Sequence, residues 1–197
     1  MRIIAGAYKG KRLVTPRGDV TRPTADQVRI ALMDTLMPWL PEARLLDLFA
    51  GAGGVGLEAL SRGAAHVTFV ERDARAVAAL RDNVAALGVT GAARVVRDDV
   101  ARALPALARG GHRFGLVFLD PPYETPLTTA TLATLGAGAL LVDGALVVAQ
   151  HLTKRPPAGI AGVLQAFRTR RFGETTLTFF RAGGYDATSS TPTPERS

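Results

Sequence analysis

From Arg44 onward, short runs of apolar residues alternate with longer segments in which apolar and polar positions recur at helical spacing. The segments 55–63 and 73–88 place apolar side chains every three or four residues, and each ends on a glycine that can cap a helix. The apolar runs have the length of strands, and they cover residues 45–49, 66–71, 93–98, 113–120 and 144–150. This regular alternation of strand and helix predicts an α/β fold with a parallel, doubly wound sheet.

The pattern changes after the fifth strand. Residues 163–172 and 174–182 flank Gly173 and favour an antiparallel pair of strands that closes the edge of the sheet. The stretch from Gly183 onward is rich in Gly, Thr, Ser and Pro, so we expect residues 183–197 to form a disordered tail.

The segment before the first strand has its own pattern. The sequences RIIAG and KRLVTP predict a small β-hairpin, and residues 24–40 predict a helix that Thr24 caps. We therefore divide the chain into an N-terminal extension (1–40), a core domain (41–182) and the tail.

Composition excludes several classes of protein. The chain has no cysteine, which rules out disulfides and cysteine-ligated zinc, and its three histidines lie far apart, so we expect no metal site. The N-terminus lacks the apolar segment of a signal peptide, and no apolar run approaches the length of a membrane span. These features predict a cytoplasmic protein that does not enter a membrane.

The net charge of +7 is concentrated at the two ends of the chain. Residues 1–30 hold seven Lys/Arg and two Asp/Glu (+5), residues 31–150 hold ten and twelve (−2), and residues 151–197 hold seven and three (+4). A basic N-terminal arm suits a phosphate backbone, although an ordinary solvated surface explains such charge equally well. The candidate RNA-binding residues are Lys9, Lys11, Arg12, Arg22 and Arg29. Arg22 and Arg29 have two further roles open to them, holding the arm across a cofactor or packing as surface residues of the helix.

The stretch DLFAGAGGVG at residues 47–56 suits two different cofactors. Gly51, Gly53 and Gly56, with Glu71 twenty positions after Gly51, match the fingerprint of a dinucleotide site. Asp47 separates the two cofactors, because a carboxylate aimed at this turn would repel a pyrophosphate but can pair with the ammonium group of S-adenosylmethionine (SAM). We therefore favour SAM, with Gly56 as a helix-packing position.

Acidic residues follow the second and third strands. Glu71 can accept hydrogen bonds from two ribose hydroxyls, a role that both cofactors share. Of Asp98 and Asp99, we expect one to accept the adenine amino group and the other to cap the next helix, and we favour Asp99 for the adenine.

The sequence LDPPYE at residues 119–124 follows the fourth strand, at the edge of the sheet where ligands bind in such folds. Pro121 and Pro122 fix the backbone and remove two amide donors, which leaves carbonyl acceptors beside the Asp120 carboxylate. Tyr123 adds an aromatic face. This combination suits a planar base that carries an exocyclic amino group and has left its stack.

These motifs resemble the amino-group methyltransferases of nucleic acids, a branch of the class I SAM-dependent enzymes. The chain is most similar to the bacterial 16S rRNA guanine-N2 methyltransferase family called RsmD. The resemblance covers nearly the whole chain, and it rests on RIIAGAYKGKRL, RPTADQVR, DLFAGAGGVGLEALSRGA, VERD, LDPPY and FGETTLTFFR.

The resemblance implies a Rossmann-like class I fold with a mostly parallel, seven-stranded sheet, an antiparallel closing hairpin and the N-terminal hairpin and helix extension. It implies methylation of the exocyclic N2 of one guanine in 16S rRNA, at the family's guanine 966, by a monomer that acts on assembling 30S particles. The cofactor residues that it implies are Asp47, Phe49, Gly51, Gly53, Glu71, Arg72 and Asp99, and the catalytic residues are Asp120, Pro121, Pro122 and Tyr123. The chain departs from the family at Gln150, where many members have a glutamate.

Three other functions remain open on the sequence. An adenine-N6 methyltransferase of DNA or RNA shares the DPPY motif. A non-catalytic RNA-binding assembly factor would share the fold, but intact Asp47, Glu71 and DPPY count against it. A NAD-dependent dehydrogenase is disfavoured by Asp47 and by the lack of a His or Lys arrangement for hydride transfer.

Overall fold

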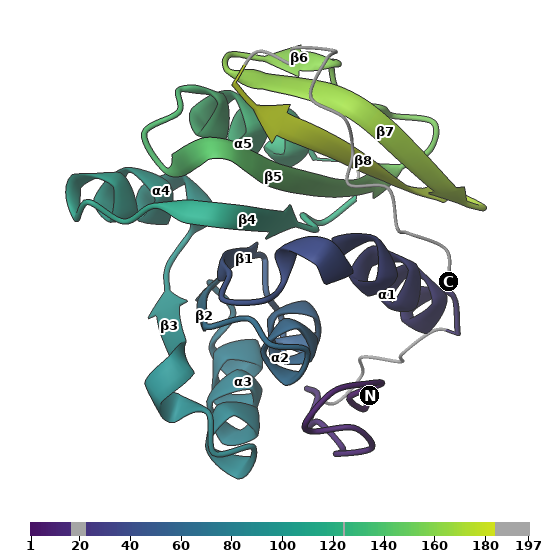
Figure 1. Ribbon diagram of the computed structural model, residues 1–197, viewed down its shortest axis with the longest axis vertical. Helices are drawn as coiled ribbons and strands as arrows, with labels where there is room; N and C mark the ends of the chain where they lie inside the picture. The colour runs from purple at the N-terminus through teal and green to yellow at the C-terminus, as the bar shows by residue number, and fades with distance from the viewer. Residues whose placement is uncertain (17–22, 124, 184–197) are drawn as a thin grey trace, which may run out of the picture.

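The computed structural model describes residues 1–16, 23–123 and 125–183, and Arg22 and the expected tail (184–197) lie outside them. One sheet crosses the molecule in the strand order β3–β2–β1–β4–β5–β8–β7–β6 (Figure 1). The strands are β1 (Arg44–Leu48), β2 (His66–Glu71), β3 (Ala93–Arg97), β4 (Phe114–Leu119), β5 (Leu141–Leu152), β6 (Ile160–Ala161), β7 (Leu164–Phe172) and β8 (Thr175–Ala182). The helices are α1 (Pro23–Leu36), α2 (Gly54–Ser61), α3 (Ala74–Ala86), α4 (Val100–Arg109) and α5 (Leu127–Gly136), with short 3₁₀ turns at Met37–Trp39 and Thr90–Ala92.

The sheet confirms the predicted α/β class. Strands β1 to β5 pair in parallel, and β8, β7 and β6 complete the sheet in antiparallel fashion. All seven strands that the sequence predicts for this sheet are present. The structure adds β6, a strand of two residues that is too short to produce a periodic pattern in the sequence.

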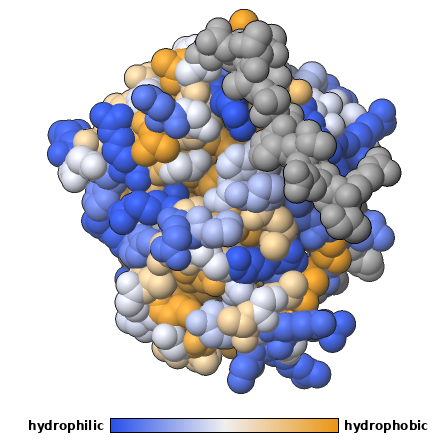
Figure 2. All heavy atoms as spheres, viewed as in Figure 1, coloured by the Kyte–Doolittle hydropathy of each residue, from blue (hydrophilic) through white to orange (hydrophobic). Residues whose placement is uncertain are grey.

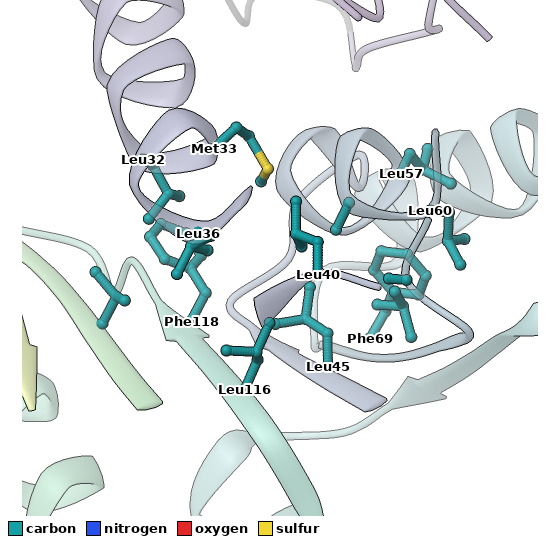
Figure 3. Close-up of a cluster of buried hydrophobic side chains, with 14 of the residues drawn as sticks. Leu32, Met33, Leu36, Leu40, Leu45, Leu57, Leu60, Phe69, Leu116 and Phe118 are labelled. Atoms are coloured by element: carbon teal, nitrogen blue, oxygen red, sulfur yellow. The ribbon is translucent and has the colours of Figure 1, made fainter. Parts of the chain in front are cut away.

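Two apolar layers cover the two faces of the sheet. Successive residues of β1 point to opposite faces, so that Leu45 packs with α1, α2 and α3 while Leu46 packs with α4 and α5. Figure 3 shows the first layer, in which Phe118 of β4 lies against Leu36 at the end of α1 and Leu116 lies beside Leu45 of β1. Because both faces are covered, the central strand β4 is apolar throughout, as the sequence of residues 113–120 predicted.

The N-terminal segment differs from the expected hairpin. It forms a single antiparallel bridge between Arg2 and Arg12, flanked by hydrogen bonds from the Ile3 amide to the Lys11 carbonyl (2.9 Å) and from the Leu13 amide to the Met1 carbonyl (3.0 Å). Helix α1 begins at Pro23, one residue before the expected start, where a proline is well tolerated because the first amide of a helix has no partner.

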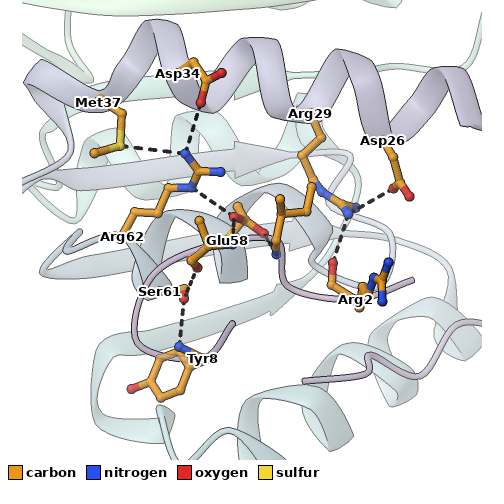
Figure 4. A network of polar contacts seen from close by, with 11 residues as sticks. Arg2, Tyr8, Asp26, Arg29, Asp34, Met37, Glu58, Ser61 and Arg62 are labelled. Atoms are coloured by element: carbon orange, nitrogen blue, oxygen red, sulfur yellow. Dashed lines mark hydrogen bonds and ion pairs between the residues drawn. The ribbon is translucent and has the colours of Figure 1, made fainter. Parts of the chain in front are cut away.

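This arm is held by polar side chains of α1 and α2 (Figure 4). The fully buried Glu58 carboxylate accepts the amides of Ile4 (2.7 Å) and Ala5 (3.0 Å) and pairs with Arg62. The Arg29 guanidinium donates to the Arg2 carbonyl (3.0 Å). The arm is therefore part of the packed structure and covers the helix that follows the glycine turn.

The surface in the same view carries hydrophilic and hydrophobic residues side by side (Figure 2), as is usual for a globular protein. Among the described helices, none is both long and apolar enough to cross a bilayer.

Candidate active site

A pocket of about 420 Å³ lies at the carboxyl ends of the parallel strands, within the size range of small-molecule sites. It combines residues at or just after the ends of β1, β2, β3 and β4 with Gln150 near the end of β5, and so brings together segments that are far apart in the sequence. Its lining residues are Phe49, Val70, Glu71, Arg72, Asp98, Asp99, Val100, Asp120, Pro121, Pro122, Tyr123 and Gln150. Most of these residues were expected at the site from the sequence. Gln150 was noted only as a departure from the family, and Val70 and Val100 were not expected.

The turn between β1 and α2 has a backbone that favours glycine. Gly51 and Gly53 have φ angles of 55° and 86°, and Phe49, which has a side chain, has a φ of 60°. A Cβ atom on Gly53 would also collide with the Leu80 side chain, so this glycine is required on two grounds. The strained Phe49 lies directly on the pocket, where such backbone conformations are often found in functional sites.

Asp47 lies beneath the turn and outside the pocket lining. Its carboxylate, 1% exposed, accepts the Gly56 amide in the first turn of α2 at 2.9 Å. The pKa of Asp47 is raised to about 7, mainly by burial. The Gly56 hydrogen bond opposes the shift, and the nearby charges of Asp120 and Glu71 contribute to it. Gly56 itself has no room for a side chain, because a Cβ would collide with the Phe69 ring, and this confirms its packing role.

Glu71 connects two loops of the pocket. One carboxylate oxygen accepts the Gly51 amide (2.9 Å), and the other accepts the amides of Arg72 and Asp73 (2.8 Å each). A single side chain at the end of β2 therefore orders the glycine turn and the start of α3 while it lines the pocket.

Asp98 and Asp99 both line the pocket but have different partners. Asp99 caps α4 by accepting the Ala101 amide (2.9 Å), and its second oxygen pairs with Arg72 (3.3 Å). Asp98 uses one oxygen to pair with Arg102, and this pairing lowers the pKa of Asp98. Asp99 is therefore the cap of α4, which corrects the sequence-based preference for Asp99 at the adenine with Asp98 as the cap.

The residues 120–123 form the wall of the pocket after β4. Burial raises the pKa of Asp120 to about 7. The Tyr123 hydroxyl accepts a hydrogen bond from the Gln150 amide (3.1 Å) and lies 3.3 Å from the Thr175 hydroxyl. The Thr125 hydroxyl donates to the Pro122 carbonyl (2.8 Å) and so braces the loop from the other side.

The charges around the pocket suit a cationic ligand. Asp47, Glu71 and Asp120 lie close enough for the last two charges to raise the pKa of the first. A positive group placed among these carboxylates would be stabilised, whereas a pyrophosphate would be repelled. The site therefore fits SAM, which carries a sulfonium and an ammonium, better than it fits a dinucleotide.

The candidate RNA-binding residues fall into two groups. Lys9, Lys11 and Arg12 are exposed on the arm. Arg29 is only 6% exposed, and its guanidinium binds Asp26 and the Arg2 carbonyl at 3.0 Å each. These contacts match one of the roles that the sequence left open for Arg29, namely holding the arm in place. A contact with RNA would require the guanidinium to leave its buried position. Across residues 1–16, 23–123 and 125–183, no group of three potential metal ligands occurs.

Sequence reasoning did not find the buried polar residues that attach the arm. Asn83 of α3, 1% exposed, pairs with both backbone groups of Val14 and donates to the Ala52 carbonyl in the glycine turn (3.0 Å). A single polar residue on an apolar helix face indicates a buried hydrogen-bonding partner but does not identify it.

Comparison with known proteins gives consistent results. The family model described as "Conserved hypothetical protein 95" matches residues 1–181. Ribosomal RNA small subunit methyltransferase D of Escherichia coli (strain K12) is 41% identical over 75% of this chain and 72% of its own length. The solved structure of yhhF from Escherichia coli superposes with a TM-score of 0.81 at 34% identity, covering 93% of this chain and 98% of yhhF.

The fold extends to more distant proteins. SMU.776, solved in complex with SAH, has a TM-score of 0.68 at 13% identity, covering 82% of this chain and 50% of SMU.776. At this identity the likeness concerns the fold alone. The family model and the Escherichia coli relative go further, and they show that the chain belongs to the conserved hypothetical protein 95 family of RsmD-like methyltransferases.

Proposed function

We propose that this protein transfers a methyl group from SAM to the exocyclic N2 of a guanine in 16S rRNA, at the family's guanine 966, within an assembling 30S particle. The observation that carries the proposal is the juxtaposition of the Asp120–Tyr123 loop with the glycine turn and Glu71 around one pocket. Relatives named ribosomal RNA small subunit methyltransferase D support the choice of RNA as substrate. We also propose that the protein acts as a monomer in the cytoplasm.

SAM is the cofactor, and the pocket residues divide its binding among them. We assign Glu71 to the ribose hydroxyls, and Asp99, through the carboxylate oxygen that does not cap α4, to the adenine amino group. Phe49 and Arg72 form the walls between them. Gly51 and Gly53 allow the backbone to approach the methionine part, and the Asp47 charge beneath the turn attracts its ammonium group. When bound, SAM supplies an electrophilic methyl group, so positioning and exclusion of water carry most of the rate.

Asp120 and the Pro121 carbonyl act on the amine that receives the methyl group. Both accept hydrogen bonds, and acceptors at this position favour the pyramidal amine, whose lone pair is free of the ring, over the planar one. Pro122 fixes the backbone, and Tyr123 stacks on the face of the extruded base. The amine proton leaves to water or to an Asp120 carboxylate oxygen, whose raised pKa of about 7 makes it a competent acceptor near neutral pH.

The experiment that tests this assignment separates binding from transfer. Asp120→Ala should reduce methylation of 30S subunits by at least about 100-fold while the dissociation constant for SAM, measured by calorimetry, changes by less than about threefold. Asp143→Ala, which removes an exposed acid at the start of β5, serves as the matched control and should leave both quantities unchanged. An equal loss of binding and transfer in the Asp120 variant would contradict the catalytic role.

A further inference from the structure

A second, smaller hollow lies directly behind the Asp120–Tyr123 loop. Its volume is about 170 Å³, and Pro121, Pro122 and Tyr123 form the wall that it shares with the larger pocket. The remaining lining includes the hydroxyl-bearing Thr128 and Thr129 and the side chain of Arg155. Its lining is mainly polar and its volume is below the usual range of small-molecule sites, so it suits a fragment such as a sugar-phosphate better than a whole nucleotide.

Arg155 lines this hollow, and two further basic residues, Lys154 and Arg171, belong to the two segments that are tied together beside it. The Thr153 amide donates to the Glu174 carbonyl (2.7 Å), and the Thr153 hydroxyl donates to the Gly173 carbonyl (3.0 Å). These bonds join the loop after β5, which carries Lys154 and Arg155, to the β7–β8 turn, which Arg171 precedes. The three cations therefore share the carboxyl edge of the sheet with the catalytic loop.

The local charge is strongly positive. Residues 151–183 contain six Lys/Arg and one acidic residue, Glu174, which gives a net charge of +5. Lys154, Arg155 and Arg171 are all exposed, and within the described part of the chain no ion pair involves any of them. Arg171 donates a hydrogen bond to the neutral Gly173 carbonyl (3.1 Å), which leaves its charge uncompensated. Like charges held together without a counter-charge are unfavourable in the free protein, and an anion that approaches them relieves the repulsion.

We propose that Arg155 and Arg171, with Lys154 beside them, bind the RNA phosphodiester next to the target nucleotide, and that the sugar-phosphate enters the smaller hollow. The inference rests on the proposed function and extends it. A base that reaches the Tyr123 ring must bring its backbone to the rim of the same loop, where arginine forks and threonine hydroxyls are suitable donors to phosphate oxygens.

This surface is separate from the N-terminal arm. The arm is attached to α1, α2 and α3, whereas these cations belong to the loop after β5 and to the β7–β8 hairpin. Figure 1 shows the arm below α1 and the β7–β8 hairpin above it. RNA held at both places would straddle the pocket. The arm would then add affinity, while the surface at Arg155 and Arg171 would place the target nucleotide.

The test compares two double variants with the same change of charge. Arg155→Ala/Arg171→Ala should raise KM for 30S subunits by about 10- to 100-fold with kcat within about twofold, and it should lower the slope of log Kd against log salt by about 1.4 to 1.8. The control, Arg94→Ala/Arg109→Ala, removes two exposed arginines from β3 and from the last turn of α4, which is at the opposite edge of the sheet. This control should change neither KM nor the salt slope. Arg155→Lys/Arg171→Lys keeps both charges and should restore the salt slope.

The outcomes distinguish this inference from the function beneath it. If Arg155→Ala/Arg171→Ala has the same KM and salt slope as its control, the inference is overturned. Methylation by the wild-type protein would in that case still support the proposed function. Wild-type protein that binds 30S subunits but methylates none would contradict the proposed function. In that case, weaker and less salt-dependent binding of 30S subunits by Arg155→Ala/Arg171→Ala would still support the proposed RNA contact at these two residues. The affinity for SAM should be measured for every variant as a control, and an unchanged value shows that the fold is preserved.

Discussion

Asp47 and Asp120 keep carboxylates in surroundings that disfavour their charge. Both have a pKa raised to about 7, mainly by burial, although an ordinary aspartate titrates near 4. Groups of this kind destabilise the fold, so they are uncommon except where a function requires them, and they are concentrated at functional sites. The two residues do different work, since Asp47 anchors the first turn of α2 and Asp120 faces the pocket.

Replacement of Asp47 should change the stability of the fold and the affinity for SAM in opposite directions. Because its pKa is raised in the folded state, the folded protein holds this proton more tightly than the unfolded chain, and the free energy of unfolding falls as the pH rises from about 4 to about 7. Asp47→Asn removes this titration and can still accept the Gly56 amide, so it should raise the free energy of unfolding at pH 7.5 by about 1 to 3 kcal/mol. Denaturant unfolding at pH 4.5 and 7.5 measures the difference.

The same variant should bind SAM about tenfold more weakly, because it loses the charge that attracts the ammonium group. A variant that gains stability and keeps full affinity would show that Asp47 is a structural carboxylate only.

Asp120 predicts a pH dependence of the reaction. Its carboxylate gains a proton as the pH falls through about 7, and a protonated acid is a poorer acceptor for the amine. We therefore expect kcat, measured at saturating SAM so that the ionisation of Asp47 in the free protein does not contribute, to rise with pH and to level off above about pH 7, with a slope approaching tenfold per unit on the acid side. Initial rates between pH 5.5 and 8.5 test this. The residual activity of Asp120→Asn should lack this step, and a flat wild-type profile would refute the prediction.

Individual residues differ in how far the sequence revealed them. Residues whose chemistry is visible in the letters, such as Glu71 and Asp120, lie on the pocket as predicted. The partners of polar residues were not visible, because a hydrogen bond between α3 and the arm depends on packing between segments about seventy residues apart. The choice between Asp98 and Asp99 as the helix cap likewise required the backbone geometry.

Strands and helices were the most predictable features of the fold. The observed bounds of β2 match the predicted segment 66–71. Each end of β1, β3 and β4 lies within one residue of the end predicted for that strand. β5 begins three residues before the predicted start, because a left-handed Gly144 is accommodated where the register with β4 shifts. Periodicity predicts elements well where burial is regular and poorly where the backbone is irregular.

The arm and the glycine turn are linked through one residue of α3. Asn83 bonds to both backbone groups of Val14 and to the Ala52 carbonyl. Asn83→Ala leaves these groups without their partner, so we expect a loss of about 1 to 3 kcal/mol in the free energy of unfolding. Because Ala52 belongs to the turn that receives SAM, the dissociation constant for SAM should also rise by about 3- to 10-fold.

Ser61→Ala is the matched control for this link. Ser61 ties the arm to α2 through the Ala5 carbonyl (2.6 Å) and the Tyr8 amide (3.0 Å) but makes no contact with the turn. It should loosen the arm, as limited proteolysis would reveal, without changing SAM affinity. Equal effects of the two variants on SAM affinity would rule out a specific link through Asn83.

The charge of the whole molecule is distributed as its proposed substrate requires. A core of nearly neutral charge separates two basic ends, and the exposed Lys9, Lys11 and Arg12 belong to the first of them. Replacing all three with alanine should weaken binding to 30S subunits and reduce the salt slope by about 2 to 3, since each lost phosphate contact removes about 0.7 to 0.9. Binding titrations between 50 and 200 mM salt measure both. An unchanged slope would show that the arm is a solvated surface.

The central claim is that this molecule methylates guanine N2 in small-subunit rRNA, and identification of the modified base tests it most directly. Wild-type protein should be incubated with methyl-labelled SAM and 30S subunits that lack the modification, and the digested nucleosides should be separated and identified by mass spectrometry. We predict one equivalent of label in N2-methylguanosine, at one position of 16S rRNA, and none with Asp120→Ala. Label in N6-methyladenosine, or none in any nucleoside, would contradict the account.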